Sequence, residues 1–290
     1  MRNAATVTLP GGVWLDGMRH QEAGLRPLTG EDEAFLVEVG ASLLPARLVT
    51  ALLARCLMHI GPLDAVSAEF VRSLTVGDRE ALLLHLRRLT LGEQMECVLS
   101  CPQTDCGEKL DLTLGASDLL VPVYADAREW YERPVAENGD VYQVRFRLPT
   151  GADQEAAASL VRDDPQAAAN LMLHRCVERV TRNGDDESIT DWPAAISQQV
   201  PALMAELDAQ AELVLNLTCP ACERTFPATF DTAAYFFREL AHRASRLHQE
   251  VHLLALYYHW SEADILSLTA KRRQRYVEVL VDAMAKERGK

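Results

Sequence analysis

The sequence predicts an α+β fold that is mainly helical, and three observations support this prediction. Apolar residues recur at helical spacing through residues 29–92. They alternate with polar residues on either side of two Cys-Pro turns, in residues 93–120 and 211–230. Apolar residues spaced three and four apart run through residues 231–259 and predict one long helix. We expect a helical N-terminal unit, two cysteine-turn β-hairpins, and a C-terminal region, residues 231–290, that ends in a helical hairpin.

The composition is that of a globular protein. Of the 290 residues, 48% are apolar and 24% are charged, which excludes collagen-like and wholly disordered chains. No apolar run reaches the roughly 18 residues that a membrane span needs, and the first residues show no secretory signal. The formal charge of −13 disfavours general binding to nucleic acid. We therefore expect a chain without a membrane span that is cytoplasmic during its assembly.

The N-terminal part is expected to be an extended arm followed by helices. Residues 1–28 form the arm, and Thr29 can cap a helix whose first turn is acidic. Pro45 suits the start of the next helix, in which apolar residues recur every four positions as far as Ile60. Asp78 opens a third helix, which ends before a glycine at position 92.

The middle of the chain, residues 121–210, is expected to be a region inserted between the two cysteine hairpins. Pro201 should break or kink its last helix. An exposed loop, one strand and three helical stretches are predicted, in that order, at residues 132–140, 141–149, 151–162, 165–181 and 192–208.

The two cysteine turns form a partial internal repeat. In each, a strand enters a Cys-Pro turn, leaves it from a second cysteine and becomes a strand again. Four thiolates on two facing turns could hold a tetrahedral zinc ion at about 2.3 Å per bond. We therefore predict a split zinc-ribbon-like module with one structural zinc per chain, bound by Cys101, Cys106, Cys219 and Cys222.

Two features depart from the usual zinc turn. The first turn is two residues longer than usual, and Glu223 follows the last cysteine where glycine normally eases a positive backbone angle. Two alternatives therefore stay open, namely buried thiols left by a decayed site, and a redox pair at positions 219 and 222. A site of four thiolates leaves no open position on the metal, so even a filled one favours folding over catalysis.

The remaining candidate ligands have simpler interpretations. Cys56 and Cys176 lie among apolar residues at helical spacing and are expected in the core. Cys97 falls on a strand, so it is expected to pack there and not to bind metal. His248 and His252 are four residues apart, but the glutamate that a zinc-protease helix needs directly after the first histidine is missing.

The long C-terminal helix carries an apolar seam that is expected to bind another helix. The C-terminal helix can cover only about half of that seam, so the rest should meet the N-terminal unit or a second protein. The seam residues predicted to bind a partner are Phe237, Leu240, Leu247, Val251, Leu254 and Tyr258.

A basic step, KRRQR at residues 271–275, offers an alternative function as a zinc-ribbon regulator that binds nucleic acid. The acidic chain around it disfavours that function, and a solvated or protein-binding face is expected instead. The sequence contains no phosphate-binding loop, dinucleotide fingerprint or nucleophile elbow, so no enzymatic activity is expected.

Segments at residues 25–36 (LRPLTGEDEAFL), 76–102 and 106–120 resemble the T-even-type baseplate hub assembly family of contractile-tail phages and related contractile injection systems. Segments at residues 146–157 (FRLPTGADQEAA), 217–231 (LTCPACERTFPATFD) and 250–280 resemble later parts of the baseplate proteins of injection-system clusters. The last segment is also similar to C-terminal parts of tail assembly chaperones.

This resemblance implies a non-enzymatic role in building a baseplate. The chain would act as a hub component or as a hub assembly chaperone, with other baseplate or tail hub proteins as its partners. No small-molecule substrate is implied, and the family supplies no catalytic residues.

Overall fold

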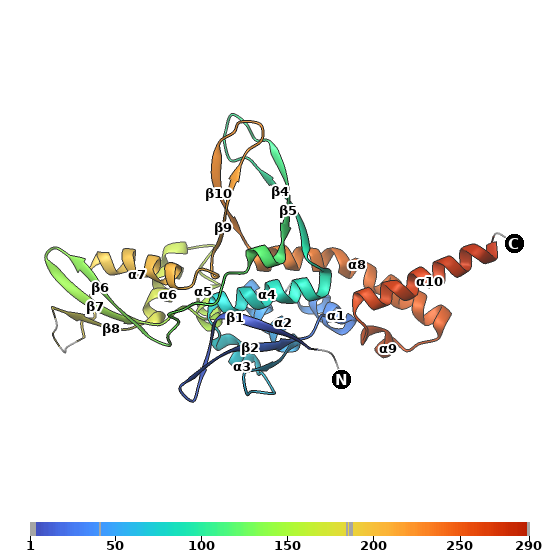
Figure 1. Ribbon diagram of the computed structural model, residues 1–290, viewed down its shortest axis with the longest axis horizontal. Coiled ribbons are helices and arrows are strands. Elements are labelled where there is room, and N and C mark those ends of the chain that lie inside the picture. The colour runs from blue at the N-terminus through green and yellow to red at the C-terminus, as the bar shows by residue number, and fades with distance from the viewer. Residues whose placement is uncertain (1–3, 41, 184, 186–187, 289–290) are drawn as a thin grey trace.

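The computed structural model describes residues 4–40, 42–183, 185 and 188–288. It shows an elongated body from whose middle two β-hairpins project together (Figure 1). Helices and strands are mixed along the chain, as the α+β prediction expects. Among the described residues, no helix combines the length and the apolar character needed to cross a membrane.

The chain consists of two similar units followed by a C-terminal group of helices. Unit 1 spans residues 5–115 and contains β1 (Ala5–Leu15), β2 (Met18–Leu25), α1 (Gly30–Val39), α2 (Pro45–Cys56), β3 (Leu57–Ile60), α3 (Ala68–Ser73), α4 (Val76–Leu91), β4 (Gln94–Ser100) and β5 (Lys109–Gly115). After a short 3-10 helix, unit 2 spans residues 131–230 and contains β6 (Tyr131–Glu137), β7 (Asp140–Phe146), α5 (Gly151–Ala157), α6 (Pro165–Cys176), β8 (Val177–Arg182), α7 (Ala194–Leu207), β9 (Leu213–Thr218) and β10 (Thr225–Phe230). The C-terminal helices are α8 (Thr232–Tyr258), α9 (Glu262–Leu266) and α10 (Ala270–Arg288).

The two units share their topology and their strand register. Each begins with a three-stranded antiparallel sheet, of order β1-β2-β3 in unit 1 and β6-β7-β8 in unit 2. The pairing of the last two strands shifts at the same place in both sheets. The matching Cα pairs are Ala23–Ile60, Gly24–His59 and Leu25–Leu57 in unit 1, and Val144–Val180, Arg145–Arg179 and Phe146–Val177 in unit 2. Region 121–210, which was expected to be an insertion, is therefore largely a second copy of the N-terminal fold.

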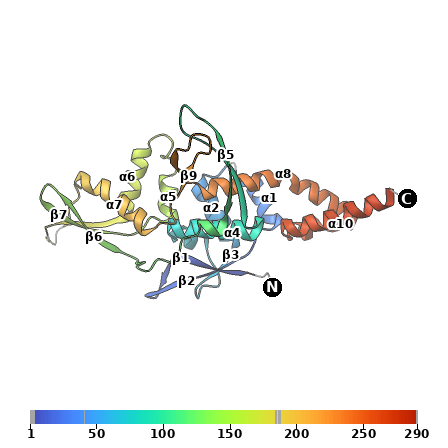
Figure 2. The same cartoon turned by 45° about the horizontal axis from the view of Figure 1, so that its top comes forward.

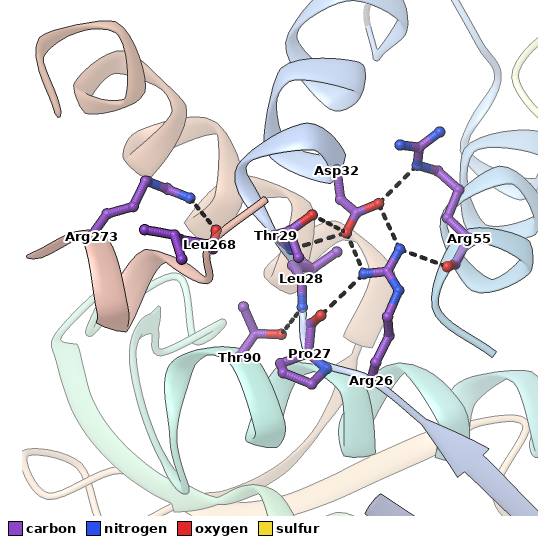
Figure 3. Close-up of polar contacts among 9 residues, drawn as sticks. All are labelled: Arg26, Pro27, Leu28, Thr29, Asp32, Arg55, Thr90, Leu268 and Arg273. Atoms are coloured by element: carbon purple, nitrogen blue, oxygen red, sulfur yellow. Dashed lines mark hydrogen bonds and ion pairs between the residues drawn. The ribbon is translucent and has the colours of Figure 1, made fainter. Parts of the chain in front are cut away.

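The same buried ion pairs join strand to helices in both units. In unit 1, Arg26 donates hydrogen bonds to both carboxylate oxygens of Asp32, at 2.6 and 3.1 Å, and Arg55 donates to the same carboxylate at 2.9 Å. Asp32 also accepts from the backbone N–H of Thr29 at 2.9 Å, which closes a capping box at the start of α1 (Figure 3). The end of β2, the start of α1 and the end of α2 are thereby tied at one buried carboxylate.

Unit 2 repeats this arrangement almost atom for atom. Arg147 donates to both oxygens of Asp153, at 2.6 and 3.0 Å, and Arg175 donates at 2.8 Å. The backbone N–H of Thr150 again bonds the carboxylate at 2.9 Å. The repeated sequence is R-x-x-T-G-x-D before the first helix, and P-x9-R-C along the second.

A second repeated segment docks on the glycine of each R-x-x-T-G-x-D sequence. Residues 67–79 and 261–273 share the pattern S-x-x-x-[V/I]-x-S-L-T-x-x-x-R. The backbone N–H of Gly151 donates to the Leu74 carbonyl at 3.1 Å, and that of Gly30 donates to the Leu268 carbonyl at 3.0 Å. The first segment therefore connects unit 1 to unit 2, and the second attaches the C-terminal helices to unit 1.

The arginine that ends each docking segment is buried at the same glycine. Arg79 and Arg273 are each only 1% exposed. A Cβ atom placed on Gly151 would lie 2.3 Å from Nη1 of Arg79, and one on Gly30 would lie 2.8 Å from Nη1 of Arg273. Only glycine leaves room for these guanidinium groups.

Four sequence predictions about strands are wrong. The predicted arm 1–28, where the structure describes it, forms the hairpin β1–β2 over residues 5–25. The sequence pattern hides these strands, because a register shift between Thr8 and Val13 interrupts the alternation that marks a strand. Most of the predicted loop 132–140 is strand β6, and the last part of the predicted helix 165–181 is strand β8. Ile60, expected to continue a helix, lies in β3.

Candidate metal centre

The two cysteine hairpins rise together from the middle of the body (Figure 1). Strands β4 and β5 pair from Gln94–Gly115 to Ser100–Lys109, and β9 and β10 pair from Leu213–Phe230 to Thr218–Thr225. Each hairpin is therefore a regular ladder that carries its cysteine turn to the far tip. Unit 1 supplies one turn and unit 2 the other, so the tips bring the two units together far from their sheets.

Four sulfur atoms meet between the turns. Sγ of Cys101 lies 3.8 Å from Sγ of Cys222, and Sγ of Cys106 lies 3.7 Å from Sγ of Cys219. All four sulfur atoms lie within 4.8 Å of one another, and no other group of three or more His, Cys, Asp or Glu side chains in the described part of the chain comes together in this way. The sequence predicts these four cysteines as metal ligands, and the fold brings their sulfur atoms together.

The sulfur positions fit a metal ion. Four ligands at about 2.3 Å from a tetrahedral centre lie about 3.8 Å apart, which matches the two close sulfur pairs. Cys101 and Cys219 are buried, and Cys106 and Cys222 are half-buried, so the site is largely closed to solvent. Four thiols are also an unusual set to bury together without a shared ion.

Both turns reach the required backbone geometry in spite of their unusual sequences. Gly107 has φ 64° and Glu223 has φ 57°, so the residue after the second cysteine is left-handed in both turns. Glu223 therefore does not prevent the turn, although it adopts a conformation that glycine would adopt at lower cost. The longer first turn is closed by the N–H of Cys106, which donates to the carbonyl of Gln103 at 3.0 Å.

The local backbone favours a thiolate at Cys219. The N–H groups of Cys222 and Ala221 point at its sulfur, and they lower the pKa of the Cys219 thiol to about 7. The thiolate is the form that binds a metal. Burial raises the pKa of the helix-core thiols Cys56 and Cys176 to about 12. Within the sulfur cluster, burial and the neighbouring Cys219 and Cys222 sulfur atoms raise the pKa of Cys106 to about 12 as well.

Side chains outside the sulfur cluster hold the turns against each other. Arg224 of the second turn donates hydrogen bonds to both carboxylate oxygens of Asp105 in the first, at 2.9 and 3.0 Å. Below the turns, Leu110 and Phe226 are buried beside Cys101 and Cys219. The two hairpins therefore touch through an ion pair and an apolar layer as well as through the sulfur atoms.

The other candidate ligands lie elsewhere. Cys97 is half-buried on β4 opposite Leu112 and is not part of the sulfur cluster. Cys56 and Cys176 are buried at the ends of α2 and α6. His248 and His252 are both exposed on α8.

The apolar seam of α8 packs largely inside the chain. Leu240, Leu247 and Leu254 are at most 3% exposed, while Phe237, Val251 and Tyr258 are half-buried. Helix α8 contacts α1, α2 and α4 of unit 1 as well as α9 and α10. The fully buried seam residues therefore act in the core, and binding of a second protein by the half-buried ones stays a prediction.

The basic step at residues 271–275 is divided between core and solvent. Arg273 is buried and paired with Glu33 and Glu250, at 2.5 and 2.8 Å, whereas Arg275 is exposed and pairs with Glu278. The step therefore cannot present all of its charges to nucleic acid.

Sequence reasoning missed the two Arg–Asp networks and the docking segments. Their signal was present in the sequence, because R-x-x-T-G-x-D occurs at residues 26–32 and again at 147–153. Comparing the chain with itself beyond the cysteine turns would have found it.

The chain matches a known protein family. The family described as T4 bacteriophage base plate protein matches residues 5–238, which include both units and the start of α8. No curated protein and no solved structure was found to match. The family match covers most of the chain, so this protein belongs to the T4 bacteriophage base plate protein family.

Proposed function

We propose that this chain works without catalysis in building the hub of a contractile tail baseplate, as a hub component or as the chaperone that assembles it. The observation that carries this proposal is the family match over residues 5–238. The resemblance of residues 25–36, 76–102 and 106–120 to hub assembly proteins supports the hub in particular. Its partners are then other tail hub proteins.

We further propose that the four clustered cysteines hold one structural zinc ion. A tetrahedral set of four thiolates suits zinc and leaves no open position for substrate or water. The ion would join a turn of unit 1 to a turn of unit 2, which supports a role in folding and in fixing the two hairpins. A scaffold held in this way fits a protein whose task is to position other proteins.

The hub role can be tested with tagged protein and purified particles. We expect the chain to co-purify with tail hub proteins before assembly is complete, and a deletion to stop baseplate formation. Mass spectrometry of finished particles separates the two forms of the proposal. A chain retained in the particle is a component, and a chain lost from it is a chaperone.

Normal baseplates in the deletion strain would overturn the hub role. A complementing Cys97→Ser variant serves as the matched control for cysteine loss, because Cys97 lies outside the sulfur cluster. Complementation by Cys97→Ser but not by Cys219→Ser would connect the metal centre to assembly.

A further inference from the structure

Unit 2 has an open apolar groove, and the equivalent surface of unit 1 is covered by helix α8. The groove has a volume of about 400 Å³ and lies between α5, α6 and α7. Six of the residues that line it are Pro149, Ala169, Met172, Leu173, Pro201 and Met204.

Each of these six residues has a counterpart in unit 1. The R-x-x-T-G-x-D sequences align α1 with α5, and the P-x9-R-C sequences align α2 with α6. Helices α4 and α7 align because each begins the same number of residues before the first cysteine of its cysteine turn, Cys101 or Cys219, and packs on the first strand of its own sheet. In the same order, the counterparts are Leu28, Val49, Leu52, Leu53, Leu83 and Leu86.

In unit 1 these counterparts are covered by α8. All six belong to one buried apolar cluster, and Phe236 and Leu240 of α8 complete that cluster at 0% and 3% exposure. Figure 2 shows α8 running beside α1, α2 and α4 and away from α6 and α7. The two apolar side chains are four residues apart and so project from one face of the helix.

The exposed residues of the groove show that unit 2 lacks the covering helix that unit 1 has. Val49 and Leu83 are buried, whereas the matching Ala169 and Pro201 are exposed. Arg87 of α4 donates to Glu239 of α8 at 2.6 and 2.9 Å, but its counterpart on α7 is the exposed Ala205. Unit 2 therefore keeps the walls of a helix-binding site, and among the described residues no helix occupies it.

We propose that the groove of unit 2 binds an amphipathic helix of another baseplate protein, one that presents two large apolar side chains one turn apart. The identity of the partner as a baseplate protein rests on the proposed function. The binding mode rests on unit 1, in which a helix with this spacing fills the equivalent site. Helix α8 of a second copy is excluded as the occupant, because its Phe236 and Leu240 are buried in their own chain.

The test uses a fluorescent peptide with the sequence of residues 231–246 as the probe, added to the intact protein. We expect saturable binding, and an about tenfold or greater loss of affinity in the Ala205→Glu variant, whose new charge lies in the groove. Ala202→Glu is the matched control, because Ala202 is also exposed on α7 but does not line the groove. A peptide with Phe236→Ser and Leu240→Ser should not bind.

Three results would overturn the proposal. Absence of peptide binding to the wild-type protein would show that the groove is not a helix site. Equal binding of the peptide by the Ala205→Glu and Ala202→Glu variants would show the same. Self-association of the protein that Ala205→Glu abolishes would show that a second copy occupies the groove. The peptide assay needs no other tail protein, so its outcome is independent of whether the hub role holds.

Discussion

Glu223 carries an identifiable strain in the metal centre. Its φ of 57° lies in the left-handed region, which costs a residue other than glycine about 1 kcal/mol or more. The side chain is exposed, so its removal takes away no buried contact. We expect Glu223→Gly to raise the free energy of unfolding by about 0.5–1 kcal/mol, measured by urea denaturation. A Glu223→Gly variant with unchanged or lower stability would contradict the inference that Glu223 is strained.

Asp153 makes stability depend on acid. Burial alone would raise its pKa, but the Arg147 guanidinium and the N–H and hydroxyl of Thr150 outweigh burial and hold the pKa at about 2. Since the folded pKa lies below the unfolded one, this carboxylate stabilises the fold above about pH 5, and the stabilisation is lost as pH falls toward 2. After allowance for solvent screening, the contribution is about 1–2 kcal/mol.

The variant Asp153→Asn tests this acid dependence. We expect it to lower the free energy of unfolding at pH 7 by about 3 kcal/mol, because it leaves Arg147 and Arg175 without their buried partner. It should also flatten the fall in stability between pH 5 and pH 3 in urea titrations. Asp163→Asn removes an exposed carboxylate and serves as the control. An acid dependence equal to that of the wild type would contradict the assignment.

At the scale of elements, Gly30 is the contact through which the C-terminal helices dock on α1. A Cβ there would lie 2.8 Å from Arg273 and 2.9 Å from the backbone Cα of Leu266. Helix α9 would have to shift away from α1 to make room for this Cβ. We therefore expect Gly30→Ala to destabilise the protein by about 1–3 kcal/mol in thermal or urea unfolding. Glu31→Ala, at the exposed neighbouring position, should change stability little. If Gly30→Ala is as stable as the wild type, the contact between α1 and α9 has room for a Cβ.

The sequence predicts the long elements of this fold better than the short ones. Helix α8 was readable because its apolar residues keep one spacing over most of its length. Strand β3 was not, because its four residues directly follow α2 and Ile60 continues the helical spacing. Strand β6 resembles a loop in the sequence, because Glu132 and Pro134 give it a polar appearance.

The candidate site was more predictable than the fold around it. Four cysteines on two similar turns form a local signal that needs no knowledge of tertiary structure. The two sheets are copies that lie about 120 residues apart in the sequence, as Arg26 and Arg147 show, and only a few identical residues record the duplication. The docking segments were equally hidden, since they connect Leu268 to Gly30 and Leu74 to Gly151 across the chain.

For the whole molecule, the sulfur cluster is where the two units meet far from their sheets. Each unit contributes one hairpin and two cysteines, so a bound ion cross-links residues that are more than 110 positions apart in the sequence. Because metal binding to such a site also contributes to folding, removal of the metal should weaken the packing of the two units against each other. Chelation should therefore lower the melting temperature of the wild-type protein but not that of Cys219→Ser.

The most direct measurement is the metal content of protein purified without added zinc, by elemental mass spectrometry. The expected result is one zinc per chain in the wild type and in Cys97→Ser, and loss of zinc in Cys219→Ser. Fewer than about 0.2 equivalents of zinc in well-folded wild-type protein would contradict a structural zinc site held by both units.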